Sequence, residues 1–419
     1  MPPSSVEWMA AVLFAAALIH TFAAKFFERL SHRYPKHAGL LHLLGEVEVV
    51  FGFWAIVLIV CMAWLQDGKQ ALAYAESRQY TEPLFVFVVM VVAASKPILS
   101  FVISAMNALS RLMPMRASLA KAWLCLCVVP LLGSAITEPA AMTIAALMLA
   151  PQAFRTEVPE RVKYLALGVL FVNISIGGTL TSYAAPPVLM VANVWNWDSA
   201  FMFTQFGWKA ALAVLVNATV AVYFLRNHLG VNAVVNGAAL AESIPKSVVL
   251  VHLGFLAAVV ALAHYPVAFM GLFVMFMGFA QAYERYQSPL ILKEALLVGF
   301  FLAGLVVLGG MQQWWLQPMV STMDPQVLFY GTTVLTAFTD NAALTYLGSL
   351  ILDISDEAKY SLVAGAVAGG GLTVIANAPN PAGVALLRAG FADASVGAGG
   401  LLLGALFPTL VAMAALLYL

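Results

Sequence analysis

The sequence has few charged residues and few cysteines. Charged residues make up 10% of its 419 residues and the net charge is zero, whereas about a quarter of the residues are charged in a typical soluble domain. Without a basic excess, nothing favours a nucleic-acid partner. Cys61, Cys125 and Cys127 lie in apolar segments, with no histidine or further cysteine at ligand spacing. We therefore expect them to be small buried hydrophobes.

Signatures of soluble enzymes are also missing from the sequence. There is no glycine-rich phosphate loop followed by Lys-Ser/Thr, no H-E-x-x-H and no G-x-S-x-G. The glycine-rich segments have no basic residue that could meet a phosphate, which disfavours an ATP-driven pump. A membrane-embedded enzyme would need a nucleophile or a metal set that the sequence does not offer. We expect neither an enzyme nor a resident cofactor.

Apolar residues dominate the chain instead. They make up 63% of the sequence and the mean hydropathy is +0.93, more than one protein core can use. The sequence therefore predicts an all-α protein that crosses the lipid bilayer many times, since a spanning helix needs about 20 apolar residues. Uninterrupted apolar runs cover residues 8–24, 40–65, 84–106, 206–225, 247–264, 266–282, 290–309 and 397–418, and interrupted runs cover residues 119–152, 162–194, 324–353 and 358–386.

The chain contains an internal repeat. Three spans, a run interrupted by polar residues, a run interrupted by Gly and Pro, and a last span occur twice in the same order. The first half is predicted over residues 1–230, with scaffold spans in 8–106 and the remaining elements in 119–225. The second half covers 246–419, with scaffold spans in 247–309 and the remaining elements in 324–418. Three blocks also match in sequence, Thr137–Ala141 with Thr339–Ala343, Gly178–Thr181 with Gly370–Thr373, and Ala184–Pro187 with Ala376–Pro379.

Arm length and positive charge predict the topology. The arms of each first interrupted run have roughly 13 to 18 residues, fewer than a spanning helix needs, so we expect a re-entrant hairpin in each half. Five crossings per half then invert the second half relative to the first. With this topology fifteen of the 20 Lys and Arg residues face one side, four face the other and Lys96 lies inside a span. That bias predicts an inner-membrane protein with both termini in the periplasm.

Two segments, residues 177–187 and 369–381, are rich in glycine and proline and break their apolar runs. Irregular backbone at membrane depth persists only where protein or a water-filled cavity surrounds it. Freed carbonyl groups there can coordinate a cation, and the alternative is a kink eased by neighbouring helices. Side chains that would complete such a site are Thr181, Ser182, Thr373, Asn377 and Asn380.

Each predicted hairpin has a carboxylate at its tip, Glu138 in the first and Asp340 in the second. A charge at membrane depth costs several kcal/mol and marks a functional site by default. Burial favours the protonated form, so protons and a hard cation compete for the same oxygens. We expect sodium at Asp340 and Glu138, with Thr137, Thr339 and Asn341 beside them. The alternative is that each acid only caps the second arm of its hairpin.

Other polar residues inside the spans are candidates for accessory roles. Glu46 and Glu48 lie at the start of the second span, and being two residues apart they point in different directions. Lys96 lies inside the third span, where it either titrates during transport or, as we favour, pairs with one of these glutamates. Asn173 is placed to extend the first unwound segment.

The paired motifs, a hairpin tip followed by G-G-x-x-T and then N-x-P-N or A-x-P-P, resemble the ion-transporter superfamily. This group contains NhaD-type sodium/proton antiporters, arsenite permeases and divalent-anion/sodium symporters. The blocks at 137–141, 339–347 and 370–381 are most similar to the sodium/proton antiporters of the group. The resemblance implies a homodimer whose scaffold spans form the interface. It also implies a transport unit of hairpins and broken helices that moves as an elevator.

One departure from the superfamily bears on the substrate. The dicarboxylate symporters have a neutral Ser-Asn-Thr motif at each tip, whereas this chain has Thr-Glu-Pro from Thr137 and Thr-Asp-Asn from Thr339. Carboxylates at both tips would repel an anion. The sequence therefore favours exchange of sodium, or another monovalent cation, for protons by alternating access. A sodium- or proton-coupled transporter of an organic or inorganic anion on the same fold is the alternative.

Overall fold

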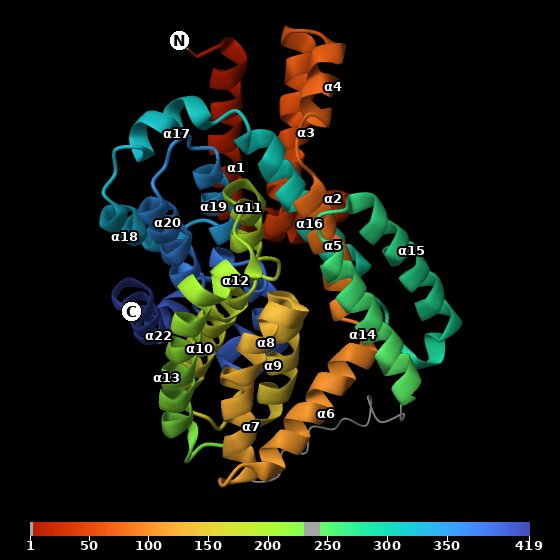
Figure 1. Cartoon of the computed structure of the whole chain (residues 1–419), viewed down its shortest axis with the longest axis vertical. Helices are drawn as coiled ribbons and strands as arrows, with labels where there is room; N and C mark the ends of the chain where they lie inside the picture. The colour runs from red at the N-terminus through yellow and green to blue at the C-terminus, as the bar shows by residue number, and fades with distance from the viewer. Residues whose placement is uncertain (1–2, 230–243) are drawn as a thin grey trace.

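The computed structural model describes residues 3–229 and 244–419, which are helical with no strand (Figure 1). Residue 1 and residue 230, the predicted bounds of the first half, lie outside these described residues. Helices of the first half are α1 (Ser5–Arg33), α2 (Ala38–Leu44), α3 (Val47–Leu65), α4 (Gly68–Glu76), α5 (Thr81–Ala93), α6 (Lys96–Leu112), α7 (Ala117–Leu126), α8 (Val128–Ile136), α9 (Glu138–Ala153), α10 (Glu160–Gly177), α11 (Pro186–Trp195), α12 (Ser199–Met202) and α13 (Trp208–Leu225).

The second half has the same order of long helices and interrupted segments. Its helices are α14 (Lys246–Ala261), α15 (Pro266–Ala282), α16 (Leu292–Gly309), α17 (Gln313–Val320), α18 (Pro325–Thr336), α19 (Asn341–Ser349), α20 (Asp356–Gly369), α21 (Asn380–Leu387) and α22 (Ala398–Tyr418). Proline lies in the first turn of many of these helices, for example Pro139 in α9 and Pro186 in α11, because a first-turn N–H has no partner inside the helix anyway.

Many of the helices are suited to a membrane. Six of the described helices are long and apolar enough to cross one, or up to eight if each of two bent pairs is one span. The chain is therefore a multi-pass membrane protein, while the ten predicted crossings stay a prediction. One bent pair is α5 and α6, which meet at 62°. The predicted continuous span over 84–106 is therefore broken, because Pro97 cannot donate to the helix ladder across the break.

The two hairpins differ in arm length. Both arms of the second hairpin are short, since α18 has 12 residues and α19 has 9. In the first hairpin α7 and α8 together are long and apolar enough for a span, but they are bent by 42°, as a broken span or a re-entrant loop would be. The re-entrant first hairpin therefore stays a prediction. Pro130 causes the bend, because it lacks the N–H that would bond the carbonyl of Leu126. The amide of Asn173 donates to that carbonyl instead, at 2.7 Å.

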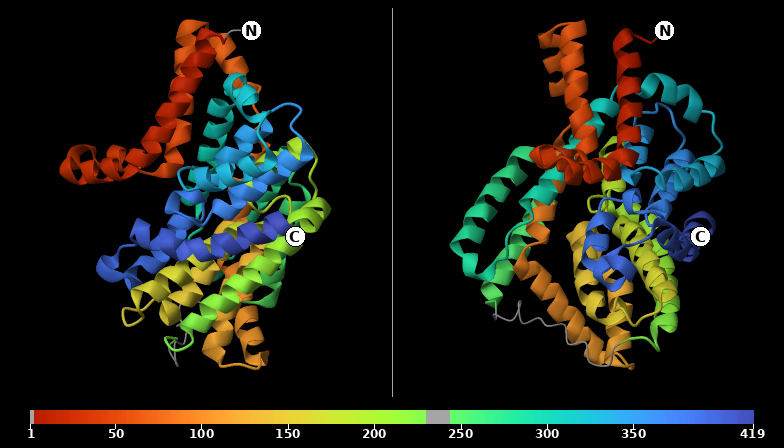
Figure 2. Two further views of the ribbon diagram at one scale, coloured as in Figure 1. Left: turned by 90° about the vertical axis from the view of Figure 1, so that its left-hand side faces the viewer. Right: turned by 180° about the vertical axis from the view of Figure 1, so that it is seen from behind.

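Both predicted broken helices are present, and each reaches across to the other half. In the first, α10 ends at Gly177 and the chain is extended before α11 begins; in the second, α20 ends at Gly369 and α21 begins at Asn380. The segment α11 packs against α19 of the second hairpin, and α21 packs against α9 of the first. Along α10 lies α22, the last helix of the other half (Figures 1 and 2).

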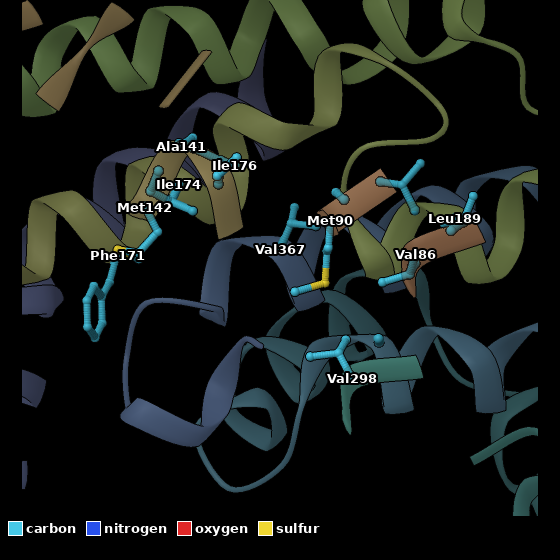
Figure 3. Close-up of a cluster of buried hydrophobic side chains, with 14 of the residues drawn as sticks. Val86, Met90, Ala141, Met142, Phe171, Ile174, Ile176, Leu189, Val298 and Val367 are labelled. Atoms are coloured by element: carbon cyan, nitrogen blue, oxygen red, sulfur yellow. The ribbon is translucent and has the colours of Figure 1, made fainter. Parts of the chain in front are cut away.

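The hydrophobic core joins the two halves. Figure 3 shows Met90 of α5 near Val298 of α16 and Val367 of α20, with Ile174 of α10 further away in the same buried cluster. All four side chains are buried. Because one core serves both halves, the hairpin tips and the unwound segments are held together by packing from the whole chain.

Candidate functional site

Glu138 lies at the tip of the first hairpin as the first residue of α9, and its side chain is 0% exposed. Thr137 turns the chain there with a φ of 77°, a conformation that side chains disfavour and that clusters at functional sites. The Nδ2 amide of Asn377 donates to Oε2 of Glu138 at 2.8 Å. The other carboxylate oxygen, Oε1, is buried without a hydrogen-bond partner.

Glycine brings the first unwound segment onto the same carboxylate. A Cβ added at Gly178 would lie 2.5 Å from Oε1 of Glu138, so a side chain at this position would displace the acid. Asn377 belongs to the second unwound segment. Glu138 is therefore held between the two broken helices, where both halves of the chain contribute to its surroundings.

Asp340 is used differently at the second tip. Its side chain caps α19, since Oδ1 accepts the backbone N–H groups of Ala342 at 2.8 Å and Ala343 at 3.3 Å. Its side chain is partly exposed. Asp340 thus caps its helix, whereas Glu138 makes no such cap. The two acids lie close enough for the charge on Asp340 to act on Glu138.

Some buried oxygens without a hydrogen-bond partner lie elsewhere, such as Asn107 Oδ1 and Gln152 Oε1, but five belong to the predicted site residues. In native structures such groups are rare and each calls for an explanation, such as a bound ion. Carboxylate, amide and hydroxyl oxygens are the ligands that suit hard cations. The five atoms are Glu138 Oε1, Thr137 Oγ1, Asn341 Oδ1, Asn377 Oδ1 and Asn380 Oδ1.

The threonine and serine side chains of the unwound segments hold these segments in place. The hydroxyl of Thr181 donates to the carbonyl of Ser134 in the first hairpin, at 2.7 Å, and the hydroxyl of Thr373 donates to that of Ala337 in the second, at 3.0 Å. Thr181 and Thr373 are matching positions of the repeat. Ser182 shares a 3.2 Å hydrogen bond with Ser199. Each unwound segment is therefore tied to the hairpin of its own half.

A polar cavity of about 520 Å³ reaches the first unwound segment. Its lining includes Ser182, and it also includes Glu82, Asp198 and His264. The amide of Asn193 at the end of α11 donates to Glu82 at the start of α5, at 2.7 Å. The lining residues lie on the side predicted to be periplasmic, and Glu138 is not among them.

Comparison with known proteins identifies the family. A family model described as "Putative Na+/H+ antiporter" matches residues 5–419, nearly the whole chain. The chain belongs to this family. No curated protein matches it significantly.

Membership in the antiporter family agrees with the resemblance seen in the motifs and makes the chain a transporter whose expected substrates are Na+ and H+. Within residues 3–229 and 244–419, no three His, Cys, Asp or Glu side chains gather as a metal site. Neutral oxygens around one or two carboxylates are the alternative ligand set, and they suit a transported monovalent cation.

The predicted accessory charges of the antiporter chain have other partners than the sequence suggested. Lys293 pairs with Glu46 at 3.1 Å, and no carboxylate in the described residues lies within salt-bridge distance of Lys96. The predicted pairing of Lys96 with Glu46 or Glu48 is therefore wrong. Lys96 begins α6 at the bend after α5, whereas Glu46 lies before α3, beside α16. The charge of Glu48 acts on Asp340 and also on Glu46, and that these glutamates point in different directions stays a prediction.

Two further predicted residues lie apart from the cluster around Glu138. Asn173 donates to the carbonyl of Leu126 and accepts from the amide of Asn217 at 2.9 Å, so it joins helices rather than extending the unwound segment. Thr339 is half-buried and lines an apolar cavity behind the second tip.

Sequence reasoning missed two serines. Ser134 donates to the carbonyl of Gly177 at 2.7 Å and accepts the N–H of Leu180 at 3.0 Å, which fixes the end of α10. Ser175 donates to the carbonyl of Val367 at 2.8 Å. The available signal was a small polar residue a few positions before a tip or a glycine pair inside an apolar run.

Proposed function

We propose that the protein exchanges sodium, or another monovalent cation, for protons, and that Glu138 takes both ions in turn. The observation that carries this proposal is the dry carboxylate with one bonded and one unpartnered oxygen. A buried charge without compensation is costly, so an ionised Glu138 demands a cation beside it. When the carboxyl group is protonated, that demand is gone and the cation leaves.

We assign different roles to the two oxygens of Glu138. Asn377 donates to Oε2 through an N–H group, which stays a donor at any pH, so Oε2 stays an acceptor. Oε1 is then the atom that takes either the proton or the cation. Oδ1 of Asn377 and Oγ1 of Thr137 are further buried acceptors without partners that would complete the coordination.

Asp340 supports the exchange from the second tip in this proposal. Its negative charge acts on Glu138, so binding a cation or a proton between the two relieves repulsion. Its Oδ1 is already engaged by the first turn of α19. We therefore assign it an electrostatic role and assign Glu138 the direct one. Asn341 and Asn380 supply further unpartnered oxygens beside the second unwound segment.

We also propose that the two halves, 1–230 and 246–419, form an inverted repeat that works by alternating access. Ser175 and Val367 are matching positions, and their hydrogen bond is what a two-fold axis between α10 and α20 would produce. The reciprocal packing of α11 on α19 and α21 on α9 supports the same relation. The elevator motion, the homodimer and the inner-membrane orientation with periplasmic termini extend this proposal on the family resemblance and the charge bias.

Transport by the purified protein in liposomes tests the function. With a pH-sensitive dye inside, an imposed sodium gradient should drive protons in the opposite direction, and dissipating the gradient should stop the signal. Sodium that moves no protons contradicts the proposal. Sodium-driven uptake of an anion would instead support the symport alternative.

A further inference from the structure

An apolar cavity of about 400 Å³ lies behind the second hairpin, between α1, α17, α18 and α19. Its size falls in the range of roughly 300 to 1,000 Å³ that is usual for ligand pockets. No charged residue lines it. The lining side chains include Phe22, Trp315, Leu335, Phe338 and Thr339.

The cavity has few polar groups that could form hydrogen bonds with water. Apart from Thr339, the lining residues with a polar side-chain group are Thr332 and Trp315. The hydroxyl of Thr332 donates to the carbonyl of Leu328 at 2.8 Å, and the indole N–H of Trp315 donates to Gln312 at 2.8 Å. An apolar cavity whose polar groups are already bonded stays dry. An occupant of this space must therefore be hydrocarbon.

The surroundings indicate where the hydrocarbon comes from. Phe22, Leu335 and Phe338 line the cavity and are also exposed on the outside of the chain. Phe22 belongs to a helix that is apolar and long enough to cross a membrane. The mouth of the cavity thus opens toward the bilayer, where acyl chains are the solvent, and a flexible chain can enter a recess that a rigid helix of another protein cannot.

We infer that this cavity binds the acyl chain of a membrane lipid. The bound chain would lie against Phe338 and Thr339, next to the tip that carries Asp340. The inference concerns lipid binding only and does not depend on the transport activity proposed above.

Photo-crosslinking tests the site on the whole protein in liposomes. Phosphatidylglycerol with a diazirine near the end of one acyl chain is activated by light, and the modified peptides are mapped by mass spectrometry. We expect adducts on residues 315–347 well above those on the exposed face of α14. Equal labelling of the two regions would overturn the inference.

A glycine substitution sharpens the test. Gly331 lines the cavity, and a Cβ added there meets no atom within 4 Å, so Gly331→Leu fills the space without displacing the backbone. Adducts in the cavity should fall about tenfold because the leucine occupies the volume of the chain. Gly254→Leu is the matched control, since Gly254 on α14 is equally open and should change nothing.

Two outcomes of the crosslinking experiments would overturn the inference. One is a labelling pattern that is the same in Gly331→Leu and in the unmodified protein. The other is a cavity free of lipid adducts in the unmodified protein, as a second copy of the chain covering it would give. The second result is measured on the unmodified protein, so misfolding of a variant cannot cause it.

Discussion

The two hairpin tips occupy matching positions of the repeat but treat their acids in opposite ways. Glu138 is fully buried, is bonded by an amide from the other half and has one unpartnered oxygen. Asp340 is half-buried and its Oδ1 is bonded by its own helix. The N–H groups of α19 favour the charged form of Asp340, whereas Oε1 of Glu138 has no donor. In the proposed exchange, Glu138 is therefore the acid that takes an exchangeable partner.

A single position of the repeat explains this difference. The block Ala184–Pro187 matches Ala376–Pro379, so Ala185 corresponds to Asn377. The second unwound segment therefore offers an amide to the first tip, whereas the first segment has only a methyl group to offer the second tip. In the proposed function, the repeat would build the scaffold twice, and this one side chain would make the first tip the ion site.

The largest expected effect is that of Glu138→Gln. The amide has nearly the same shape, but it offers no charge to balance sodium and no proton to exchange, so exchange should fall about 100-fold or more. Sodium-driven proton movement in liposomes measures this. Glu157→Gln, on an exposed side chain, is the control and should behave like the unmodified protein.

Asn377→Ala should have the next largest effect. Losing a hydrogen bond to a buried charged group costs about 1.5 to 3 kcal/mol, so apparent sodium affinity should fall about tenfold or more. Asn193→Ala removes a similar bond, to Glu82, away from the tips. If both variants weaken sodium binding equally, the special role of the Asn377 contact is refuted.

Gly178→Ala tests the close approach of the first unwound segment. The added methyl group would meet Oε1 of Glu138, so exchange should fall about tenfold while the fold is kept, as expected for a small displacement of a reacting group. Gly271→Ala adds the same methyl group where nothing lies within 4 Å and should be neutral. A rate unchanged by Gly178→Ala would show that Oε1 has more room than the structure gives it.

Asp340→Asn should have the smallest effect on exchange. Asparagine caps a helix as well as aspartate does, so thermal stability should be kept while the loss of charge slows exchange by only a few-fold. Asp340→Ala should in addition lose about 1 kcal/mol of stability with the cap. Thermal unfolding and the liposome assay separate the two variants. A loss in Asp340→Asn as large as that in Glu138→Gln would reverse the order of the tips.

Much of this architecture could be predicted from the sequence because its signals are local. Glycine and proline mark the ends of α10 and the start of α11, and an acid before an apolar arm marks each tip. The bend between α7 and α8 also has a local cause, Pro130, but a proline inside a span gives no sign of how far the helix bends.

The partners of the site residues could not be predicted in the same way. Asn377 and Glu138 are separated by 239 positions in the chain, so only tertiary packing brings them together. The same holds for Lys293 and Glu46, which pair with each other, whereas the sequence predicted a pair between Lys96 and Glu46 or Glu48. Residue type named the candidate oxygens, whereas only the packing shows which of them lie close to Glu138.

Counting the protons released when sodium binds tests the central claim most directly. Calorimetric titration of the purified protein, repeated in buffers with different ionisation enthalpies, gives this number without any gradient or membrane potential. The account predicts that the unmodified protein releases a proton on binding sodium and that Glu138→Gln does not. Sodium binding with no proton release, or equal release from both proteins, would contradict it.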